Sequence, residues 1–243
     1  MKCGKIIGVG KTAIIYEYEK GKVLKLFNQG YPYEAVEKEY YNAIAIRNMD
    51  FAKPKVYELI TYENRNGIIY DRVDGESLLD WVIRTGDLHE CATCMAKVHK
   101  AIIENKVSNL PNYKDFLRNQ IQKTSLTLDK QQEVLHMLDK LPDGNTLCHG
   151  DFHPGNIIIS GEEAFVIDFM NICSGNYLYD VARTVFLVEY TPVPKDANDR
   201  EKLLHFKKTL SDLYLVQMNV SREMIQDYLS VITVARKGEC PDE

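Results

Sequence analysis

The sequence predicts an α+β protein with a small strand-rich N-terminal part and a larger, mainly helical C-terminal part. Residues 5–73 contain short β-branched runs separated by glycine and polar turns, with one helical segment among them. From Ser77 onward, apolar residues mostly recur at the three- and four-residue spacing of helices. One further pair of short apolar runs surrounds the turn Ser160-Gly161. We therefore expect one lobe at residues 1–73 and a second at residues 74–243.

Composition limits the classes of protein that this chain can represent. Its 243 residues are enough to bury a core, and 45% apolar with 27% charged residues is ordinary for a soluble globular protein. The net charge of −5 predicts no basic face for nucleic acid. No run approaches the roughly 18 apolar residues of a membrane span, and the apolar run at the N-terminus is too short for a secretory signal. We expect a cytoplasmic protein without membrane contact, and the composition leaves the oligomeric state open.

Three strands are predicted at the start of the chain, over residues 5–7, 13–18 and 23–27. Gly8 and Gly10 lie in the turn between the first two, where glycine lets backbone N–H groups approach a phosphate closely. The run from Gly8 to Thr12 ends like a Walker A loop, but position 5 is lysine where that motif has glycine. The run also leads into a strand and not into a helix, so we do not expect a P-loop.

Lys25 is a charged residue inside the third apolar strand. Strand alternation places it on the same face as Val23 and Phe27. A lysine on an apolar face needs anionic partners, which phosphate or carboxylate oxygens provide. The alternative is that its ammonium group reaches solvent at the end of the strand.

The remaining N-terminal elements are a helix and two more strands. Proline suits a first helical turn, so the helix is predicted from Pro32 to about Asn48. Strands are predicted at residues 55–61 and 67–73 around a polar turn at 63–67. Together with the first three they form a five-stranded, mostly antiparallel sheet.

Helical periodicity governs most of the chain after residue 76. Ser77 is a suitable N-cap for the first of these helices. A longer helix is predicted over residues 88–103, and further amphipathic helices over 113–139 and from Asp199 to about Arg236. The inward face of the 88–103 helix is predicted to consist of Cys91, Met95, Val98 and Ile102.

The same helix carries a cluster of potential zinc ligands. His89, Cys91, Cys94 and His99 have side chains of the type that binds zinc. Helical geometry places His89 apart from the other three, however, and six scattered cysteines form no disulfide framework. We favour small buried thiols over a metal site.

The segment richest in chemistry runs from His149 to Asn156, with the sequence His-Gly-Asp-Phe-His-Pro-Gly-Asn. An apolar strand follows it directly, and Asp168 comes at the end of the next strand. A hairpin turning at Ser160-Gly161 would bring Asn156 and Asp168 to the same end. Phosphoryl transfer needs such groups, namely a carboxylate that accepts a hydroxyl proton and hard oxygen ligands for Mg²⁺.

These runs also carry a family resemblance. Residues 147–158, Leu-Cys-His-Gly-Asp-Phe-His-Pro-Gly-Asn-Ile-Ile, and residues 166–169, Val-Ile-Asp-Phe, resemble the signature of the aminoglycoside phosphotransferase and choline kinase family. The resemblance implies a bilobal fold like that of protein kinases. It also implies ATP and Mg²⁺ as cofactors and a small-molecule hydroxyl as the phosphate acceptor.

The resemblance assigns roles in the C-terminal lobe and its hairpin. Asp151 is expected to orient and deprotonate the acceptor hydroxyl, while Asn156 and Asp168 hold Mg²⁺. His149 is expected to shape the loop, and His153 either to contact metal or phosphate or to pack. Asp180 resembles an Asp that braces this loop, and it is also a candidate helix cap.

The N-terminal lobe is expected to bind the nucleotide. Gly8 and Gly10 would cover the phosphates, and Lys25 would fix the α- and β-phosphates. A Glu of the following helix would pair with Lys25. Among Glu34, Glu37 and Glu39 we favour Glu39, because its helical neighbours are apolar, with Glu37 as second choice. The backbone carbonyl of Asp71 and the amide of Val73 are expected to bind the adenine edge.

Two other functions remain as alternatives. A protein kinase is disfavoured because no long activation segment with an Ala-Pro-Glu-like end follows Asp168. A nucleotide-binding module without turnover is disfavoured because none of the catalytic positions is substituted. The acceptor itself stays open among an aminoglycoside-like compound, an amino alcohol and a sugar metabolite.

Overall fold

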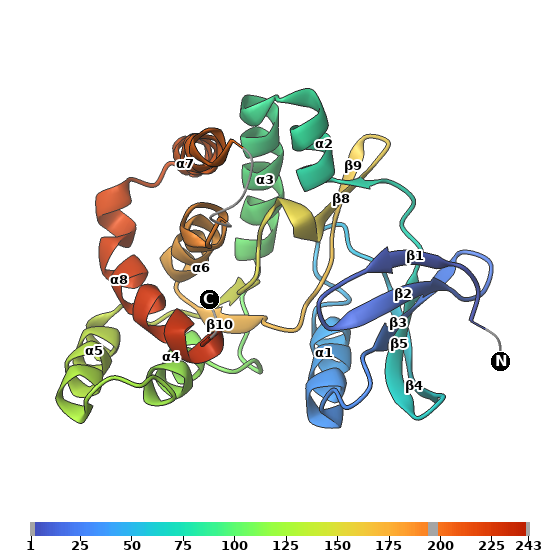
Figure 1. Ribbon diagram of the computed structural model, residues 1–243, viewed down its shortest axis with the longest axis horizontal. Coiled ribbons are helices and arrows are strands. Elements are labelled where there is room, and N and C mark those ends of the chain that lie inside the picture. Colours follow the sequence, from blue (N-terminus) through green and yellow to red (C-terminus); the bar gives the residue numbers. More distant parts are fainter. Residues whose placement is uncertain (1–2, 194–198, 242–243) are drawn as a thin grey trace. The chain divides into compact units, whose positions relative to one another are not determined.

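The computed structural model describes residues 3–193 and 199–241 (Figure 1). The chain forms two compact units, one made of Met1–Glu76 with Ile158–Asn171 and the other of Ser77–Ile157 with Ile172–Glu243. The contacts thus group a short later segment with the N-terminal strands. The functional division into lobes at residues 1–73 and 74–243 stays a prediction.

The first unit contains the five-stranded sheet that the sequence predicts. Its strand order is β1-β2-β3-β5-β4, and each pair of neighbours is antiparallel (Figure 1). Alternating apolar residues of the central strand pack into the core of this unit, including Leu24 and Leu26. The strands are β1 (Ile6–Val9), β2 (Ala13–Glu17), β3 (Lys22–Phe27), β4 (Val56–Tyr62) and β5 (Arg65–Asp71).

The turn between β4 and β5 is shorter than predicted. Glu63 and Asn64 both have positive φ, 49° and 59°, as a tight two-residue hairpin turn requires. Arg65 and Asn66 therefore belong to β5, where they pair with β4. The prediction of a polar turn over residues 63–67 was wrong because the half-buried polar residues at the start of β5 look like a loop in the sequence.

One helix, α1 (Tyr33–Ala45), accompanies this sheet. Pro32 is its N-cap, and the helix ends three residues before the predicted Asn48. Its buried residues include Glu39 and Asn42, which are polar and which bear on the site below.

A smaller sheet has the strand order β6-β8-β9. Its strands are β6 (Glu76–Ser77), β8 (Ile157–Ser160) and β9 (Glu163–Val166). Gly161 begins the turn between β8 and β9 with a φ of 62°, so the predicted strand pair around Ser160-Gly161 is confirmed. Within the first unit, the Val166 amide donates to the carbonyl of Ala52, 2.9 Å away.

The second unit is mainly helical. Ser77 caps its first helix as predicted, because its hydroxyl accepts a hydrogen bond from the Asp80 amide at 3.0 Å. The helix predicted over residues 88–103 has those bounds, and its four predicted inward residues are buried. The helices are α2 (Leu78–Thr85), α3 (Leu88–Ile103), α4 (Tyr113–Gln122), α5 (Leu128–Lys140), α6 (Tyr177–Val185), α7 (Arg200–Met218) and α8 (Arg222–Glu239), and a π-helical turn, Phe186–Tyr190, follows α6.

The potential zinc ligands on α3 lie in different surroundings. Burial raises the pKa of Cys91 to about 12, whereas His89 is exposed. His99 is buried, with one ring nitrogen bonded to the Tyr214 hydroxyl and the other to Asp180. In the described part of the chain, no three His, Cys, Asp or Glu residues are grouped as metal ligands.

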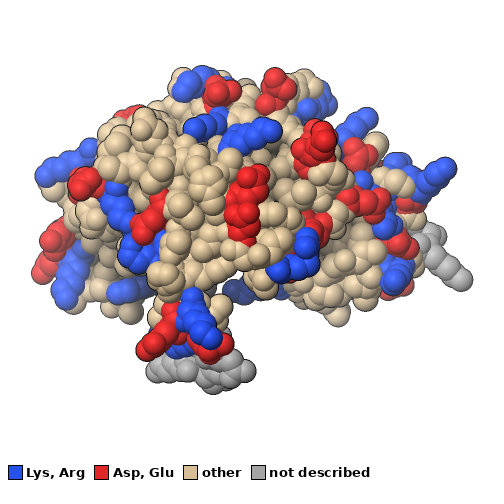
Figure 2. Space-filling model, turned by 90° about the horizontal axis from the view of Figure 1, so that it is seen from above, with Lys and Arg blue, Asp and Glu red and all other residues tan. Residues whose placement is uncertain are grey.

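Two further properties concern the surface charge and the apolar character of the helices. On the face drawn in Figure 2, acidic and basic side chains are interspersed. Among the helices of residues 3–193 and 199–241, none has both the length and the apolar character needed to span a bilayer.

Candidate active site

The first unit buries an ion pair between its central strand and its helix. The Lys25 ammonium lies 2.7 Å from Glu39 Oε1, and Glu39 is 1% exposed. The same Oε1 accepts a hydrogen bond from the Tyr70 hydroxyl at 3.1 Å. The structure thus pairs Lys25 with Glu39 and not with Glu37, as the apolar neighbours of Glu39 predict. Sequence reasoning missed Tyr70, because an aromatic residue on a strand gives no polar signal.

The charges of this pair follow from two opposing effects. Burial lowers the pKa of Lys25, but Glu39 and Asp168 outweigh it and hold that pKa above its ordinary value. Burial raises the pKa of Glu39, and Lys25 partly offsets the increase. Lys25 therefore keeps its charge at neutral pH. Its ammonium has three donors, of which two are directed at carboxylates.

Asp168 lies beside this pair in the same unit. Its Oδ1 is 3.2 Å from the Lys25 ammonium, and its side chain is 35% exposed. Its φ is +68°, a conformation that non-glycine residues rarely adopt and that costs about 1–3 kcal/mol. The Asn42 side chain donates to the carbonyls of Phe169 and Met170, at 2.8 and 3.1 Å, and so fixes the backbone just after Asp168. Sequence reasoning missed Asn42, since it looks like a surface residue of a helix.

Of the two predicted phosphate-binding glycines, only Gly10 lies in the turn between β1 and β2. Gly8, also predicted in this turn, belongs to β1 and pairs with Ile15 of β2, because strand pairing extends through it. The Gly10 amide closes the turn on the carbonyl of Ala13 at 2.9 Å. Gly8 has no positive φ, and a Cβ there would meet Ile15 at an ordinary contact distance of 3.4 Å. The fold therefore does not itself demand glycine at position 8. Close approach of a ligand to this backbone is a physical reason for glycine there.

Asp71 and Val73 lie where β5 ends. The Asp71 amide donates to the carbonyl of Lys55 at 2.9 Å, and its carboxylate accepts from the Tyr57 hydroxyl at 2.7 Å. The following amide, that of Arg72, donates to the carbonyl of Gly21 at 2.9 Å. This backbone is thus anchored to the residues that directly precede β4 and β3, and its role toward adenine stays a prediction.

The second unit carries the loop with the predicted base. The Asn156 side-chain amide donates to the backbone carbonyl of Asp151 at 2.8 Å and to its Oδ2 at 3.3 Å. The loop is shaped by its histidines: the Asp151 amide donates to His149 Nδ1, and the Gly155 amide to His153 Nδ1 at 3.1 Å. His149 thus shapes the loop as expected. His153 is the N-cap of the short 3₁₀ turn Pro154–Asn156.

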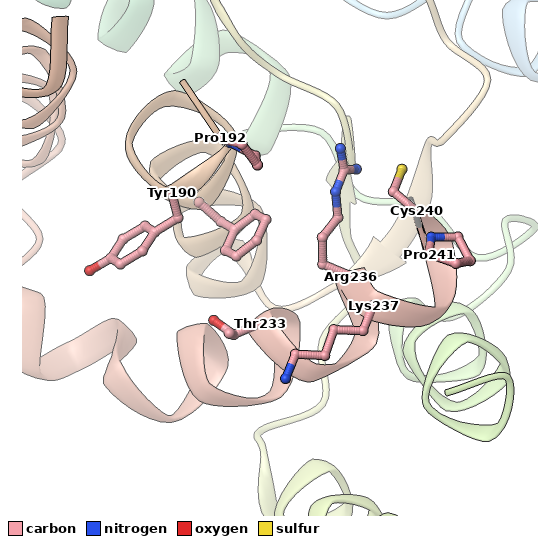
Figure 3. A pocket seen from close by; sticks show the side chains of 8 residues that line it. Tyr190, Pro192, Thr233, Arg236, Lys237, Cys240 and Pro241 are labelled. Atoms are coloured by element: carbon pink, nitrogen blue, oxygen red, sulfur yellow. The ribbon is translucent and has the colours of Figure 1, made fainter. Parts of the chain in front are cut away.

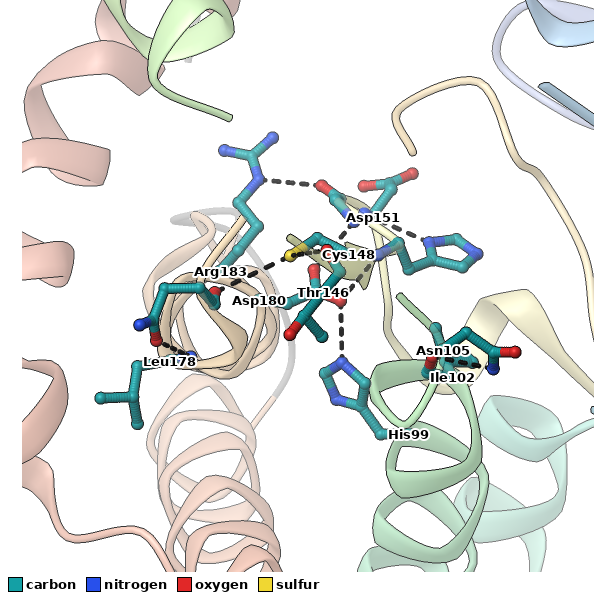
Figure 4. Close-up of polar contacts among 12 residues, drawn as sticks. His99, Ile102, Asn105, Thr146, Cys148, Asp151, Leu178, Asp180 and Arg183 are labelled. Atoms are coloured by element: carbon teal, nitrogen blue, oxygen red, sulfur yellow. Dashed lines mark hydrogen bonds and ion pairs between the residues drawn. The ribbon is translucent and has the colours of Figure 1, made fainter. Parts of the chain in front are cut away.

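Helix α6 supports this loop from below through Asp180 (Figure 4). Asp180 Oδ2 accepts from the His149 amide at 2.6 Å, and Oδ1 from the Gly150 amide at 2.8 Å. Burial raises the pKa of Asp180, but His99 and these backbone donors outweigh it and lower that pKa below its usual value. The predicted bracing of the loop is therefore present. The helix cap is Asn176 and not Asp180.

The donor chemistry of two predicted ligands fits a magnesium ion. The Asn156 side chain bonds to Asp151 through its Nδ2 alone. Among the described residues, its Oδ1 accepts no hydrogen bond and is therefore available to a metal ion. Asp168 offers a partly exposed carboxylate that also pairs with the Lys25 ammonium. Amide and carboxylate oxygens are the ligands that Mg²⁺ prefers. Asn156 belongs to the second unit and Asp168 to the first. That both side chains lie close to Asp151 therefore stays a prediction.

A separate cavity of about 160 Å³ occurs in the second unit (Figure 3). It contains none of the predicted site residues. Its lining combines aromatic rings with two basic residues near the end of α8, namely Phe186, Tyr190, Pro192, Thr233, Arg236, Lys237, Cys240 and Pro241.

One family model matches most of the chain. The model of the phosphotransferase enzyme family matches residues 13–212. Among curated protein sequences, none matches significantly. A structure of a thermostable mutant of the aminoglycoside phosphotransferase APH(4)-Ia has a TM-score of 0.69 at 15% identity, covering 97% of this chain and 86% of that one.

Two further solved structures are similar in fold. The amicoumacin kinase hAmiN, in complex with AMP-PNP, Ca²⁺ and Ami, has a TM-score of 0.63 at 17% identity and covers 97% of this chain and 79% of its own. A choline/ethanolamine kinase family protein from Mesorhizobium loti has a TM-score of 0.58 at 12% identity, with 97% and 77% covered. At these identities the likeness establishes the protein-kinase-like fold.

Proposed function

The chain belongs to the phosphotransferase enzyme family, and from this premise we propose that it transfers the γ-phosphate of ATP to a hydroxyl group of a small molecule. The observation that carries the proposal is the buried Lys25–Glu39 pair with Asp168 beside it. A charged lysine is costly to bury, and this one keeps a donor that neither carboxylate uses. A phosphate oxygen is a suitable partner for that donor.

The nucleotide is assigned to the first unit. Lys25 would bind the α- and β-phosphates, with Glu39 holding its ammonium in place. The backbone at Gly8 and Gly10 would lie against the phosphates, and the Asp71 carbonyl and Val73 amide against the adenine edge. Similar proteins support nucleotide binding as such, because one is named in complex with AMP-PNP and another in complex with ADP and streptomycin.

Proton transfer is assigned to Asp151. Its Oδ2 is fixed by Asn156, which leaves Oδ1 to accept the proton of the acceptor hydroxyl as that oxygen attacks the γ-phosphorus. Asn156 and Asp168 would hold Mg²⁺, which when bound supplies positive charge to the phosphates. The protein's own contribution is to hold the hydroxyl and the base in one geometry.

The acceptor is proposed to be a hydroxylated small molecule of aminoglycoside, amino alcohol or sugar type. Aminoglycoside phosphotransferases, an amicoumacin kinase and a choline/ethanolamine kinase family protein share the fold. Since these neighbours are named for different compounds, an assay must include all three classes.

A panel assay tests this function. ATP consumption is measured with aminoglycosides, amino alcohols, sugars and a generic protein as acceptors. We expect turnover with a member of the first three classes and none with the protein. Turnover with the protein alone would favour a protein kinase, and nucleotide binding without consumption would indicate a module without catalysis.

The variant Asp151→Asn tests the assignment of the base. It keeps the shape of the side chain but cannot accept the proton, so we expect turnover to fall by at least about 100-fold. MgATP binding, measured by calorimetry, should persist because Asp151 is not among the nucleotide ligands. A matched control is Asp143→Asn, an exposed carboxylate of the same unit. Normal turnover in Asp151→Asn would show that another group is the base.

A further inference from the structure

The peptide group that leads into Asp151 is held by a second residue of α6. The Nε of Arg183 donates to the carbonyl of Gly150 at 3.1 Å (Figure 4). That carbonyl belongs to the same planar peptide unit as the Asp151 amide. Gly150 has a φ of +75°, so its two flanking peptides turn sharply. Asp180 binds the amide on one side of Gly150, and Arg183 binds the carbonyl on the other.

Arg183 is itself buried, at 1% exposure. Its Nη2 donates to both carboxylate oxygens of Glu239, at 2.6 and 2.8 Å, and its guanidinium lies over the ring of Phe116. Burial lowers the pKa of Arg183, but Glu239 outweighs it and holds that pKa above its usual value. Among the described residues, its Nη1 has no hydrogen-bond partner. The orientation of this buried cation thus depends on Glu239.

Glu239 is held in place by helix packing. It is the last residue of α8, which packs against α6 and α4. A Cβ at the preceding Gly238 would collide with the carbonyl of Gln120 on α4, so glycine is what lets the two helices approach. Arg236, one turn earlier, also binds Glu239 at 3.2 Å. The end of α8 is therefore a fixed support.

We propose that Arg183 is a positioning residue for Asp151, and that Glu239 orients Arg183 from the end of α8. The inference rests on the proposed function, since it assigns a role toward the proposed base. In physical terms, Arg183 fixes the peptide group between Gly150 and Asp151. The Asp151 carboxylate is thereby held in one orientation toward the acceptor hydroxyl. Small displacements of a reacting group cost up to about 100-fold in rate.

A purely structural ion pair is the competing explanation, and α8 offers a matched control. Arg222, at the other end of α8, binds Glu189 and Asp212, each at 2.6 Å. Within the part of the chain that the structure describes, neither ion pair of Arg222 involves the catalytic loop. The variants Glu239→Gln and Arg222→Gln each remove one charge from an arginine–carboxylate cluster of α8, but only the first changes support of Gly150.

The experiment compares wild type, Glu239→Gln, Arg183→Lys and Arg222→Gln. We expect Glu239→Gln to lower kcat by about 10- to 100-fold with the acceptor that gives the highest turnover in the panel. The KM for MgATP should stay unchanged, because the nucleotide ligands lie elsewhere. Arg183→Lys, which keeps the charge but not both contacts, should behave in the same way. Arg222→Gln should keep the wild-type kcat.

A second readout does not depend on turnover. Hydrogen exchange in the peptide spanning residues 147–158 should become faster in Glu239→Gln and stay as in wild type in Arg222→Gln. Equal exchange and equal kcat in Glu239→Gln and wild type would overturn the positioning role. Faster exchange in a chain that consumes no ATP with any acceptor would instead overturn the proposed function, while upholding the clamp on the loop.

Discussion

Lys25 shows how a single charged residue can carry most of the information about a site. In the sequence it is an exception to an apolar strand, and in the structure it is an ion-paired cation at the centre of the first unit. The residues around it are harder to predict. Tyr70 and Asn42 are brought to this place by strand pairing and helix packing, and their own sequence neighbourhoods contain no signal for it.

Substitution of Glu39 should show how much the Lys25–Glu39 ion pair contributes to the free energy of unfolding. Glu39→Gln leaves a buried lysine with one partly exposed carboxylate, Asp168, and removing one member of a buried ion pair costs about 3–5 kcal/mol. We expect a loss near the lower end of that range, because glutamine can still accept from Lys25 and Tyr70. The KM for MgATP should rise as well. Urea unfolding at pH 7 and steady-state kinetics provide the two measurements.

Glu37→Gln is the matched control for this prediction. Glu37 lies on the same helix, half-buried, where it accepts from the Tyr33 hydroxyl at 3.4 Å. Its substitution should change stability by less than about 0.5 kcal/mol. A larger effect at Glu37 than at Glu39 would contradict the pairing described here.

At the scale of elements, α6 has the distinct task of holding a loop. Asp180 and Arg183 are three residues apart and therefore share one face of the helix, toward Gly150. The sequence could suggest Asp180 through the family resemblance. It could not suggest Arg183, because its partner Glu239 lies 56 positions further along the chain.

The carboxylate of Asp180 predicts how stability depends on pH. Its pKa in the folded protein lies below the ordinary value of 3.8, so the carboxylate favours folding above about pH 4. This contribution is lost as the pH falls through the lowered folded-state pKa. We expect the free energy of unfolding of wild type to fall over that acid range. Asp180→Asn should be less stable at pH 7 and show a flatter acid limb, as measured by urea unfolding at a series of pH values.

The outcome for Asp180→Asn separates two sources of acid sensitivity. If the variant lost stability as steeply as wild type below pH 4, other carboxylates would be responsible. Asp139 is a candidate for comparison, because Arg118 lowers its pKa. Since Asp139 is on the surface, Asp139→Asn should leave the acid limb almost unchanged.

The bounds of some helices could be predicted from the sequence, whereas those of others could not. Strong periodicity gave α3 its observed bounds, and the N-cap at Ser77 is where a capping residue is expected. The final helical region, predicted from Asp199 to about Arg236, consists of two helices, and the break between them was not predicted. Asn219 adopts a left-handed φ of 57° and ends α7. Asparagine tolerates this conformation, but its presence in a sequence does not by itself predict the end of a helix.

At the scale of the whole molecule, the first unit is discontinuous in sequence. Several of its contacts join residues before Glu76 to residues after Ile157: Lys25 to Asp168, Asn42 to Phe169 and Met170, Tyr31 to Met170, and Ala52 to Val166. Composition and periodicity predicted both groups of strands. They did not predict that the second group would be packed with the first, because periodicity describes only local structure.

Removal of the later segment should weaken the N-terminal strands. A fragment of residues 1–76 lacks the partners of Asn42 and one carboxylate beside Lys25. We expect it to unfold at a lower urea concentration than the same strands in the full chain, as followed by hydrogen exchange of β3 and β5. A fragment of equal or greater stability would mean that residues 158–171 contribute nothing to this unit.

This interleaving has a consequence during synthesis. The chain leaves the ribosome from its N-terminus, and the 95 residues from 77 to 171 must follow Glu76 before the first unit has all its parts. At about 5–20 residues per second this takes roughly 5–20 s. During that interval the N-terminal strands lack residues 158–171, and Lys25 lacks the carboxylate of Asp168. We therefore expect the nascent strands to bind chaperones that protect incomplete sheets.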